Sequence, residues 1–141
     1  MQMSYKPPSK NQEHLTPDRV HELILERWGV FSKDCFDPCP KGTPFKAPIF
    51  FNGLYGDWEK LNYVNPPYEV KTLRLFYEKA LQQTNKGNRS YMLLPSKTDQ
   101  DWFHDIIEKN FEIKWIRKRL KFKNNLHHAT DAHFIVKISN Y

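Results

Sequence analysis

The residues with the clearest chemical potential are Asn65, Pro66, Pro67 and Tyr68, which directly follow an apolar stretch of the sequence. A proline cannot donate a hydrogen bond to a β-ladder, so two prolines in succession end a strand. The first proline also holds the residue before it in an extended conformation. We therefore expect Asn65 at the tip of a strand, with its side-chain amide at the edge of a sheet and the ring of Tyr68 nearby. A flat, polar ligand such as a nucleobase fits between an amide and an aromatic ring.

The side-chain carbonyl of Asn65 and the backbone carbonyl of Pro66 would place two hydrogen-bond acceptors side by side. Two acceptors directed at the exocyclic amino group of adenine would favour the pyramidal nitrogen that can attack an electrophile. The methyl group of S-adenosylmethionine is the electrophile that suits this geometry. Tyr68 would stack on the base, which contributes about 1–3 kcal/mol per base, once the base has been flipped out of a duplex. Residues 65–68 are thus predicted to be catalytic; the alternative is a double proline that only terminates a strand.

Helical and extended patterns alternate along the chain on both sides of these residues. Thr16 is expected to cap the first helix, Pro17 to occupy its first turn and Gly29 to end it. The alternation predicts an α/β fold, with a mainly parallel sheet that is flanked by helices and ends in a C-terminal antiparallel hairpin. In chain order we expect a helix over 16–29, a short strand ending at Asp37 and Pro38, a brief strand at 49–51, a strand before Asn65, a helix around 73–80, a strand at 90–95, a helix around 102–107, and two longer strands within 111–122 and 133–138.

Three of the expected strands end in residues that could bind a ligand. These ends are Asp37 with Pro38, the run 65–68, and the run 95–98, which contains Pro95. In α/β sheets, ligands bind outside the carboxyl ends of the parallel strands. We therefore expect the three ends to converge on one edge of the sheet and to form the functional site there.

Length and composition limit the classes to which the chain can belong. Its 141 residues, 39% of them hydrophobic, predict a globular domain over residues 16–141, preceded by a flexible arm at 1–15. No apolar run approaches the ~20 residues that a membrane-spanning helix needs. Two cysteines, Cys35 and Cys39, are too few for a disulfide scaffold, which fits a reducing compartment. The net charge of +6 is compatible with a nucleic-acid partner, although many other proteins share such a charge.

Basic residues alternate with apolar ones between positions 113 and 123. The ordinary interpretation of this pattern is the solvent-facing side of an amphipathic strand, and the functional one is contact with nucleic-acid phosphates. We favour phosphate contact, with Arg119 as the first choice because a guanidinium group can hold a phosphate through two parallel hydrogen bonds. The candidate nucleic-acid-binding residues are Lys97, Arg117, Arg119, Lys121 and Lys123.

Several cysteines and histidines could in principle gather a zinc ion. The C-x₃-C spacing is imperfect for such a site, so we expect no bound metal. The residues concerned are Cys35, Cys39, His127, His128 and His133.

The chain resembles the small phage-type DNA adenine-N6 methyltransferases. In that family a T-P precedes the first helix, a D-P-C element and a tryptophan precede N-P-P-Y, and further short motifs follow it. In this sequence the motifs are T-P at 16–17, D-P-C at 37–39, G-L at 53–54 with D-W at 57–58, N-P-P-Y at 65–68, L-L-P at 93–95, T-D at 98–99, W-F-H at 102–104 and R-L-K-F at 119–122. The similarity spans about residues 16–138.

The resemblance implies a reduced Rossmann-like methyltransferase fold and S-adenosylmethionine as the cofactor. It implies that the turn at residues 37–39 lines the cofactor pocket, where many methyltransferases carry a glycine-rich turn. By analogy with other nucleotide-binding folds, Asp57 or Asp34 would hold the ribose hydroxyl groups. The candidate cofactor-binding residues are Thr16, Pro17, Asp37, Pro38, Cys39, Asp57 and Pro95.

The resemblance also implies DNA as the partner and an origin in a virus or prophage. The expected location is the cytoplasm of the host cell, or its nucleoid or nucleus when the protein is bound to DNA. The chain is too short for a separate target-recognition domain, so recognition would come from the basic residues or from a homodimer. The open alternatives are a methyltransferase that acts on RNA or on protein glutamine, and a nucleic-acid-binding remnant without catalysis.

Overall fold

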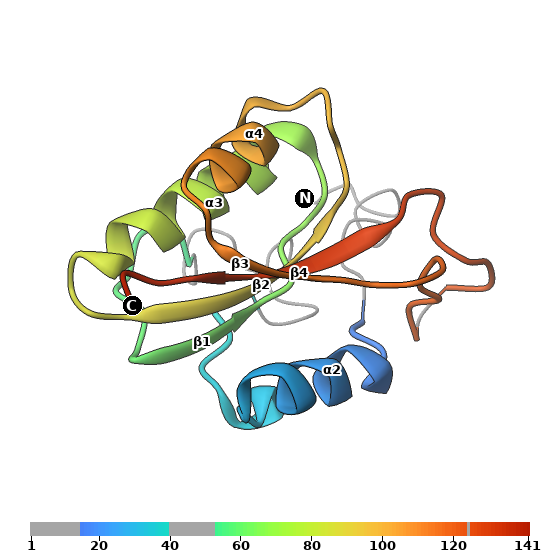
Figure 1. Ribbon diagram of the computed structural model, residues 1–141, viewed down its shortest axis with the longest axis horizontal. Coiled ribbons are helices and arrows are strands. Elements are labelled where there is room, and N and C mark those ends of the chain that lie inside the picture. The colour runs from blue at the N-terminus through green and yellow to red at the C-terminus, as the bar shows by residue number, and fades with distance from the viewer. Residues whose placement is uncertain (1–14, 40–52, 124) are drawn as a thin grey trace, which may run out of the picture.

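A four-stranded sheet forms the centre of the molecule (Figure 1). The computed structural model describes residues 15–39, 53–123 and 125–141. Positions 1–14 of the expected arm and the brief strand expected at 49–51 therefore lie outside the described residues. The strands are β1 (Leu61–Val64), β2 (Arg89–Pro95), β3 (Glu112–Trp115) and β4 (His133–Ile138), in the spatial order β1-β2-β4-β3.

The sheet is mixed. β1 and β2 are parallel, whereas β4 is antiparallel to both of its neighbours, β2 and β3. β1, β2 and β3 therefore run in the same direction, as the alternation of helices and strands predicts, and β4 runs against them. The described part of the connection from β3 to β4 contains no helix, so β4 turns back beside β3. Its insertion makes two of the three pairings antiparallel. The α/β class and the antiparallel C-terminal strand pair are thus confirmed, and the mainly parallel sheet is not.

The basic segment, by which we mean residues 117–123, does not belong to a strand. β3 is only four residues long, and Lys118 has a positive φ of 66°, which turns the chain. Leu120 and Phe122 are nevertheless buried in the apolar layer on one face of the sheet. The alternation of apolar and basic residues therefore reflects a loop packed on the core, and the strand expected within 111–122 is too long.

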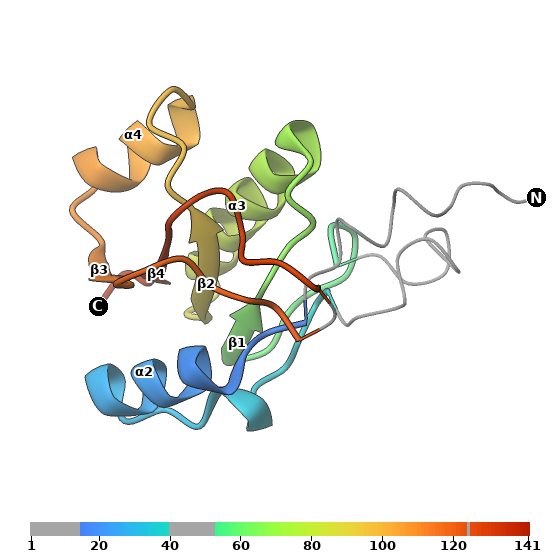
Figure 2. The same cartoon turned by 90° about the vertical axis from the view of Figure 1, so that its right-hand side faces the viewer.

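Helices cover both faces of the sheet, as expected. α2 (Asp18–Trp28) packs on one face, and α3 (Val70–Thr84) and α4 (Asp101–Glu108) lie on the other (Figures 1 and 2). Successive strand residues point to opposite faces, so Tyr63 of β1 packs with the α2 layer and Val64 with the α3 layer. The two layers fix the positions of the residues that follow β1. Within the described part of the chain, no helix is long and apolar enough to cross a membrane.

The first helix departs from the expectation at its start. It begins at Asp18, with Pro17 at the N-cap position and no side-chain hydrogen bond at the cap. The expected cap by Thr16 is wrong because the Thr16 hydroxyl group bonds to Tyr63 and Asn65 instead. At its C-terminus, α2 ends at Gly29 as expected, and Gly29 adopts a left-handed conformation with φ of 70°.

Candidate active site

Three chain segments meet at the edge of the sheet where β1 and β2 end. Phe36 forms a single parallel bridge with Asn62 of β1, so the residues after Phe36 leave the sheet in the same direction as those after β1. β1 ends directly before Asn65, which the buried Pro66 follows, and β2 ends at Pro95. The structure therefore brings the three strand ends to one edge.

The carboxamide of Asn65 is held at both ends. Its nitrogen Nδ2 donates to Oγ1 of Thr16 at 3.1 Å, and its oxygen Oδ1 accepts from the hydroxyl group of Tyr68 at 2.8 Å. The Tyr68 hydroxyl also lies 3.2 Å from the backbone carbonyl oxygen of Leu93 in β2. A carbonyl oxygen can accept two hydrogen bonds. Oδ1 can therefore bind a ligand amino group while it keeps its bond to Tyr68.

Tyr68 stays protonated throughout the neutral pH range. Burial raises the pKa of its hydroxyl group well above the ordinary value, and the nearby Tyr63 and Cys39 raise it further. The hydroxyl group therefore acts as a hydrogen-bond donor and not as a general base near pH 7. What Tyr68 can supply is a stacking surface and the orientation of Asn65.

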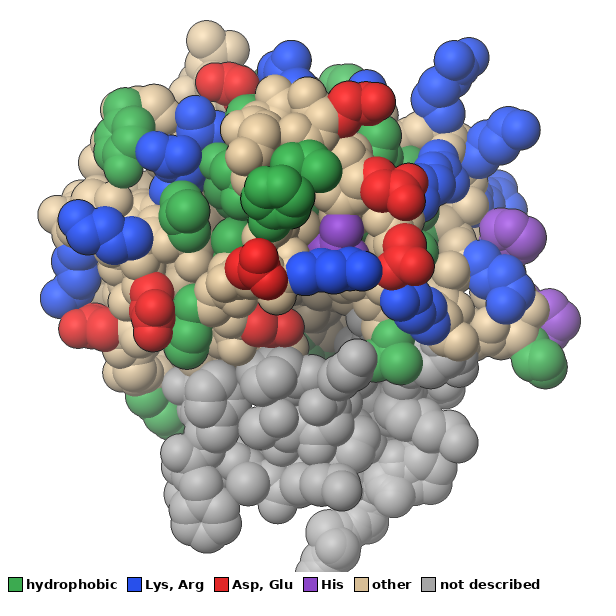
Figure 3. All heavy atoms as spheres, turned by 90° about the horizontal axis from the view of Figure 1, so that it is seen from below, with side chains coloured by type: hydrophobic (Ala, Val, Ile, Leu, Met, Phe, Trp, Pro, Cys, Tyr) green, Lys and Arg blue, Asp and Glu red, His purple; other side chains and the backbone are tan. Residues whose placement is uncertain are grey.

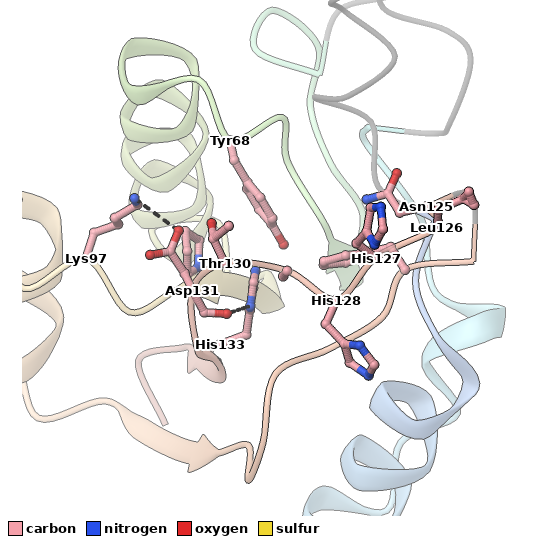
Figure 4. Close-up of a pocket in the computed structure, with 12 residues that line it drawn as sticks. Tyr68, Lys97, Asn125, Leu126, His127, His128, Thr130, Asp131 and His133 are labelled. Carbon is pink, nitrogen blue, oxygen red and sulfur yellow. Dashed lines mark hydrogen bonds and ion pairs between the residues drawn. The ribbon is translucent and has the colours of Figure 1, made fainter.

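A cavity of about 480 Å³ lies in front of Tyr68 (Figure 4). Small-molecule pockets typically measure about 300–1,000 Å³. The ring centroids of Tyr68 and His133 are 5.3 Å apart, and Phe122 lies 6.1 Å from Tyr68 and 5.4 Å from His133. Figure 4 shows the Tyr68 ring projecting between the Lys97–Asp131 pair on one side and Asn125, Leu126 and His127 on the other. An aromatic-lined cavity of this size can accept a nucleobase.

The rim of the cavity carries an ion pair. Nζ of Lys97, a candidate nucleic-acid-binding residue, lies 3.0 Å from the carboxylate of Asp131, and Pro95 lines the same cavity. Sequence reasoning misses Phe122 and His133 as cavity walls, since it places Phe122 in a strand and considers His133 only for zinc. The one available signal was the place of Phe122 in the R-L-K-F motif. Among the described residues, no three His, Cys, Asp or Glu side chains are grouped to hold a metal ion.

The turn at Asp37 is stiffened by its own side chain. Oδ1 of Asp37 accepts a hydrogen bond from the backbone N–H of Cys39 at 2.9 Å, and Pro38 and Cys39 are buried. Gly53 packs against this turn so closely that a β-carbon there would collide with the backbone carbonyl of Pro38. Nε1 of Trp58 donates to the carbonyl oxygen of Gly53 at 2.7 Å. The G-L and D-W motifs thus hold the turn in place.

We expect Gly53→Ala to lower the free energy of unfolding by roughly 1–3 kcal/mol, the usual cost of overpacking. The added methyl group meets backbone atoms, which cannot move aside as a flexible side chain can. Urea denaturation measures the loss. Gly56→Ala is the matched control, because a β-carbon at Gly56 meets nothing within 4 Å. Equal stability of the two variants would contradict the tight packing of the turn.

Asp57 and Asp34 do not lie with the other candidates. The carboxylate of Asp57 is 3.5 Å from Nζ of Lys86 and 3.5 Å from Nε2 of Gln83, near the C-terminal end of α3. α3 leads from the carboxyl end of β1 back to the start of β2, so Asp57 is at the opposite edge of the sheet from Asn65. Asp34 lines a separate cavity at the start of β1. Neither carboxylate is brought near the strand ends.

The basic segment lies beside the site. Figure 3 shows lysine, arginine and histidine side chains gathered on the side of the molecule that the β3–β4 connection forms. Nζ of Lys123 is 2.9 Å from the carboxylate of Asp18 and holds the pKa of that carboxyl below its ordinary value. Nζ of Lys121 donates to the backbone carbonyl of Asn125 at 2.9 Å. All four candidates in the segment are exposed: Arg117, Arg119, Lys121 and Lys123.

A fixed amide at a strand tip, an aromatic-lined cavity and a basic surface beside it fit an enzyme that modifies the exocyclic amino group of a nucleic-acid base. The chain belongs to the DNA N-6-adenine-methyltransferase (Dam) family, whose model matches residues 4–138. It is therefore a methyltransferase that acts on the N6 amino group of adenine in DNA, as the resemblance implies. Methyltransferases of this kind generally use S-adenosylmethionine. A comparison with curated proteins gives no match.

Proposed function

We propose that the chain transfers the methyl group of S-adenosylmethionine to an adenine that has been flipped out of duplex DNA into the cavity beside Tyr68. The observation that carries this proposal is the carboxamide of Asn65. It stands at the tip of β1 and is held by Thr16 and by Tyr68, whose ring lines the aromatic cavity of about 480 Å³.

Asn65 and Pro66 orient the amino group in this proposal. Oδ1 of Asn65 accepts one N6 hydrogen while it keeps its bond from Tyr68, and the backbone carbonyl of Pro66 accepts the other. The two bonds draw both hydrogens to one side and leave the nitrogen lone pair directed at the methyl donor. The rings of Pro66 and Pro67 stiffen the backbone, so the carbonyl needs little reorganisation. Most of the acceleration then comes from positioning.

The reaction needs no strong base in the protein. The hydroxyl group of Tyr68 is neutral near pH 7, and burial raises its pKa further, so this group cannot remove the N6 proton. The N6 nitrogen becomes acidic only after it has gained the methyl group, and water then accepts its proton. Tyr68 contributes its ring, which stacks on the flipped base.

The turn at residues 37–39 suits S-adenosylmethionine chemically. Its carboxylate, on Asp37, would attract the positively charged sulfonium and ammonium groups of this compound. Pro38 and Cys39 add apolar surface for the adenosyl part, and Gly53 holds the turn rigid. When bound, S-adenosylmethionine supplies a methyl group activated by the sulfonium centre. Asp57 and Asp34 have no part in this proposal because they lie at the opposite edge of the sheet.

The proposal is tested by mass spectrometry of nucleosides from the DNA of cells that express the chain. N6-methyladenine above the level of cells that express Asn65→Ala is the expected result. RNA nucleosides and glutamine-containing peptides from the same cells are measured in parallel. Methylation of RNA or protein without methylation of DNA would overturn the proposal, and so would the absence of all three, which would identify a binding remnant.

The exposed guanidinium groups of the basic segment are proposed to contact DNA phosphates. We expect Arg119→Ala to reduce by about one the slope of log Kd against log salt concentration, because one phosphate contact is lost. Fluorescence anisotropy with a labelled duplex measures the slope. The matched control is Arg27→Ala. Arg27 lies in the last turn of α2, where its guanidinium group is 3.5 Å from the carboxylate of Glu112. Equal slopes in both variants would remove Arg119 from the DNA contact.

A further inference from the structure

The hydroxyl group of Thr16 joins a buried tyrosine to the amide of the proposed active site. Oγ1 of Thr16 lies 2.7 Å from the hydroxyl group of Tyr63 and accepts a hydrogen bond from Nδ2 of Asn65 at 3.1 Å. Tyr63 is only 4% exposed and comes from β1, one residue before the strand ends. The Thr16 hydroxyl group therefore links the apolar core to the side chain at the strand tip.

With its hydrogen donated to Tyr63, the Thr16 hydroxyl group can only accept from Asn65, and it then sets which end of the Asn65 carboxamide faces a ligand. The terminal torsion of asparagine is soft and roughly two-fold, so the nitrogen and oxygen can exchange places at little intrinsic cost. With Nδ2 bonded to Thr16, the oxygen is directed to Tyr68 and to the place where an amino group must bind. The exchanged orientation would present an N–H group to the substrate amino group, and two donors repel one another. Thr16 thus favours the productive orientation.

The turn that carries Thr16 is anchored on the basic segment. The backbone N–H of Lys123 donates to the carbonyl oxygen of Leu15 at 3.1 Å, and Nζ of Lys123 pairs with Asp18. Arg19 donates to the backbone carbonyl of Arg117. These contacts lie on both sides of Thr16, so its position depends on the loop proposed to touch DNA. The hydroxyl group is available for this role because it does not cap α2.

We propose that Thr16 is a positioning residue, which orients the carboxamide of Asn65 for attack by the adenine amino group. This inference rests on the proposed function, since it requires Asn65 to bind that amino group. It differs from the expectation that Thr16 binds the cofactor. A cofactor-binding residue would change the affinity for S-adenosylmethionine, whereas a positioning residue changes the rate constant of methyl transfer.

Three substitutions test the inference by single-turnover methylation of duplex DNA. Thr16→Val removes the hydroxyl group and keeps the shape, and Thr16→Ala removes it without added bulk. Both are expected to reduce the rate constant about ten- to a hundredfold, as misplaced reacting groups do, with unchanged affinities for DNA and S-adenosylmethionine. Thr16→Ser keeps the hydroxyl group and is expected to stay near the wild-type rate. Thr84→Val is the matched control. It removes a buried threonine hydroxyl group that donates to the backbone carbonyl of Leu81 at the C-terminal end of α3, the end away from Asn65.

The combination with Asn65→Ala gives the decisive readout. If Thr16 acts through Asn65, Thr16→Val causes no further loss of rate once Asn65 has been replaced. An undiminished loss in that background, a weakened affinity for S-adenosylmethionine with a normal rate constant, or a Thr16→Ser variant as slow as Thr16→Val would each overturn the inference. An inactive wild-type chain or a fully active Asn65→Ala variant would instead overturn the proposed function.

Discussion

Asn65→Ala is expected to reduce the rate constant of DNA methylation by about 10²- to 10³-fold, a typical loss when one preorganised hydrogen-bonding group is removed from an active site. The variant loses the side-chain acceptor for the N6 hydrogen and keeps only the backbone carbonyl of Pro66. Single-turnover transfer of a radiolabelled methyl group to duplex DNA measures the loss. Asn85→Ala is the control, because Asn85 follows α3 at the far edge of the sheet.

Folding of this variant should change far less than its rate. Among the described residues, the carboxamide bonds to the hydroxyl groups of Thr16 and Tyr68, and a hydrogen bond contributes about 0.5–1.5 kcal/mol to stability on balance. Calorimetry should give an unchanged affinity for S-adenosylmethionine, since that compound is assigned to the turn at residues 37–39. An Asn65→Ala variant that methylates DNA at the wild-type rate would remove Asn65 from the mechanism. A variant that has lost cofactor binding would place Asn65 in the cofactor pocket.

The features that sequence reasoning predicts correctly depend on short stretches of chain. The double proline ends β1 directly before Asn65, and the continuous apolar run after Ser90 forms most of the buried strand β2. Gly29 closes α2 because a residue without a β-carbon readily adopts a positive φ. In each case the deciding interactions lie within a few residues. The convergence of the strand ends follows in turn from the parallel direction of β1 and β2.

The features that sequence reasoning misses depend on contacts between distant segments. β4 lies between β2 and β3, and this position depends on the burial of its side chains against both helical layers. The loop after β3 folds back over the core and brings Phe122 to Tyr68 and to His133, the first residue of β4, so that the three rings form the cavity wall. Thr16 satisfies the usual preferences of a helix cap, yet its hydroxyl group bonds to Asn65, 49 positions away. A local pattern carries no information on such pairings.

Tyr68→Ala is expected to reduce kcat/KM for DNA about five- to a hundredfold, because stacking of a base on an aromatic ring contributes about 1–3 kcal/mol. Tyr68→Phe keeps the ring and should retain most of the base binding. It loses the hydrogen bond to Oδ1 of Asn65, which is 2.8 Å long, so its defect should lie in kcat more than in KM. The two variants therefore separate the ring from the hydroxyl group.

The measurement uses duplex DNA with 2-aminopurine at the target position, whose fluorescence rises when the base leaves the stack and falls when it stacks on an aromatic ring. Tyr68→Phe should give the wild-type emission, and Tyr68→Ala should give a brighter signal because the flipped base has lost its stacking partner. Tyr141→Ala serves as the control, since Tyr141 is 67% exposed and contacts Arg89 at the start of β2, away from the cavity. If Phe and Ala at position 68 weaken DNA binding equally, the ring of Tyr68 does not hold the base. The cavity that Phe122 and His133 complete would then bind some other part of the substrate, because base binding there requires the three rings to act together.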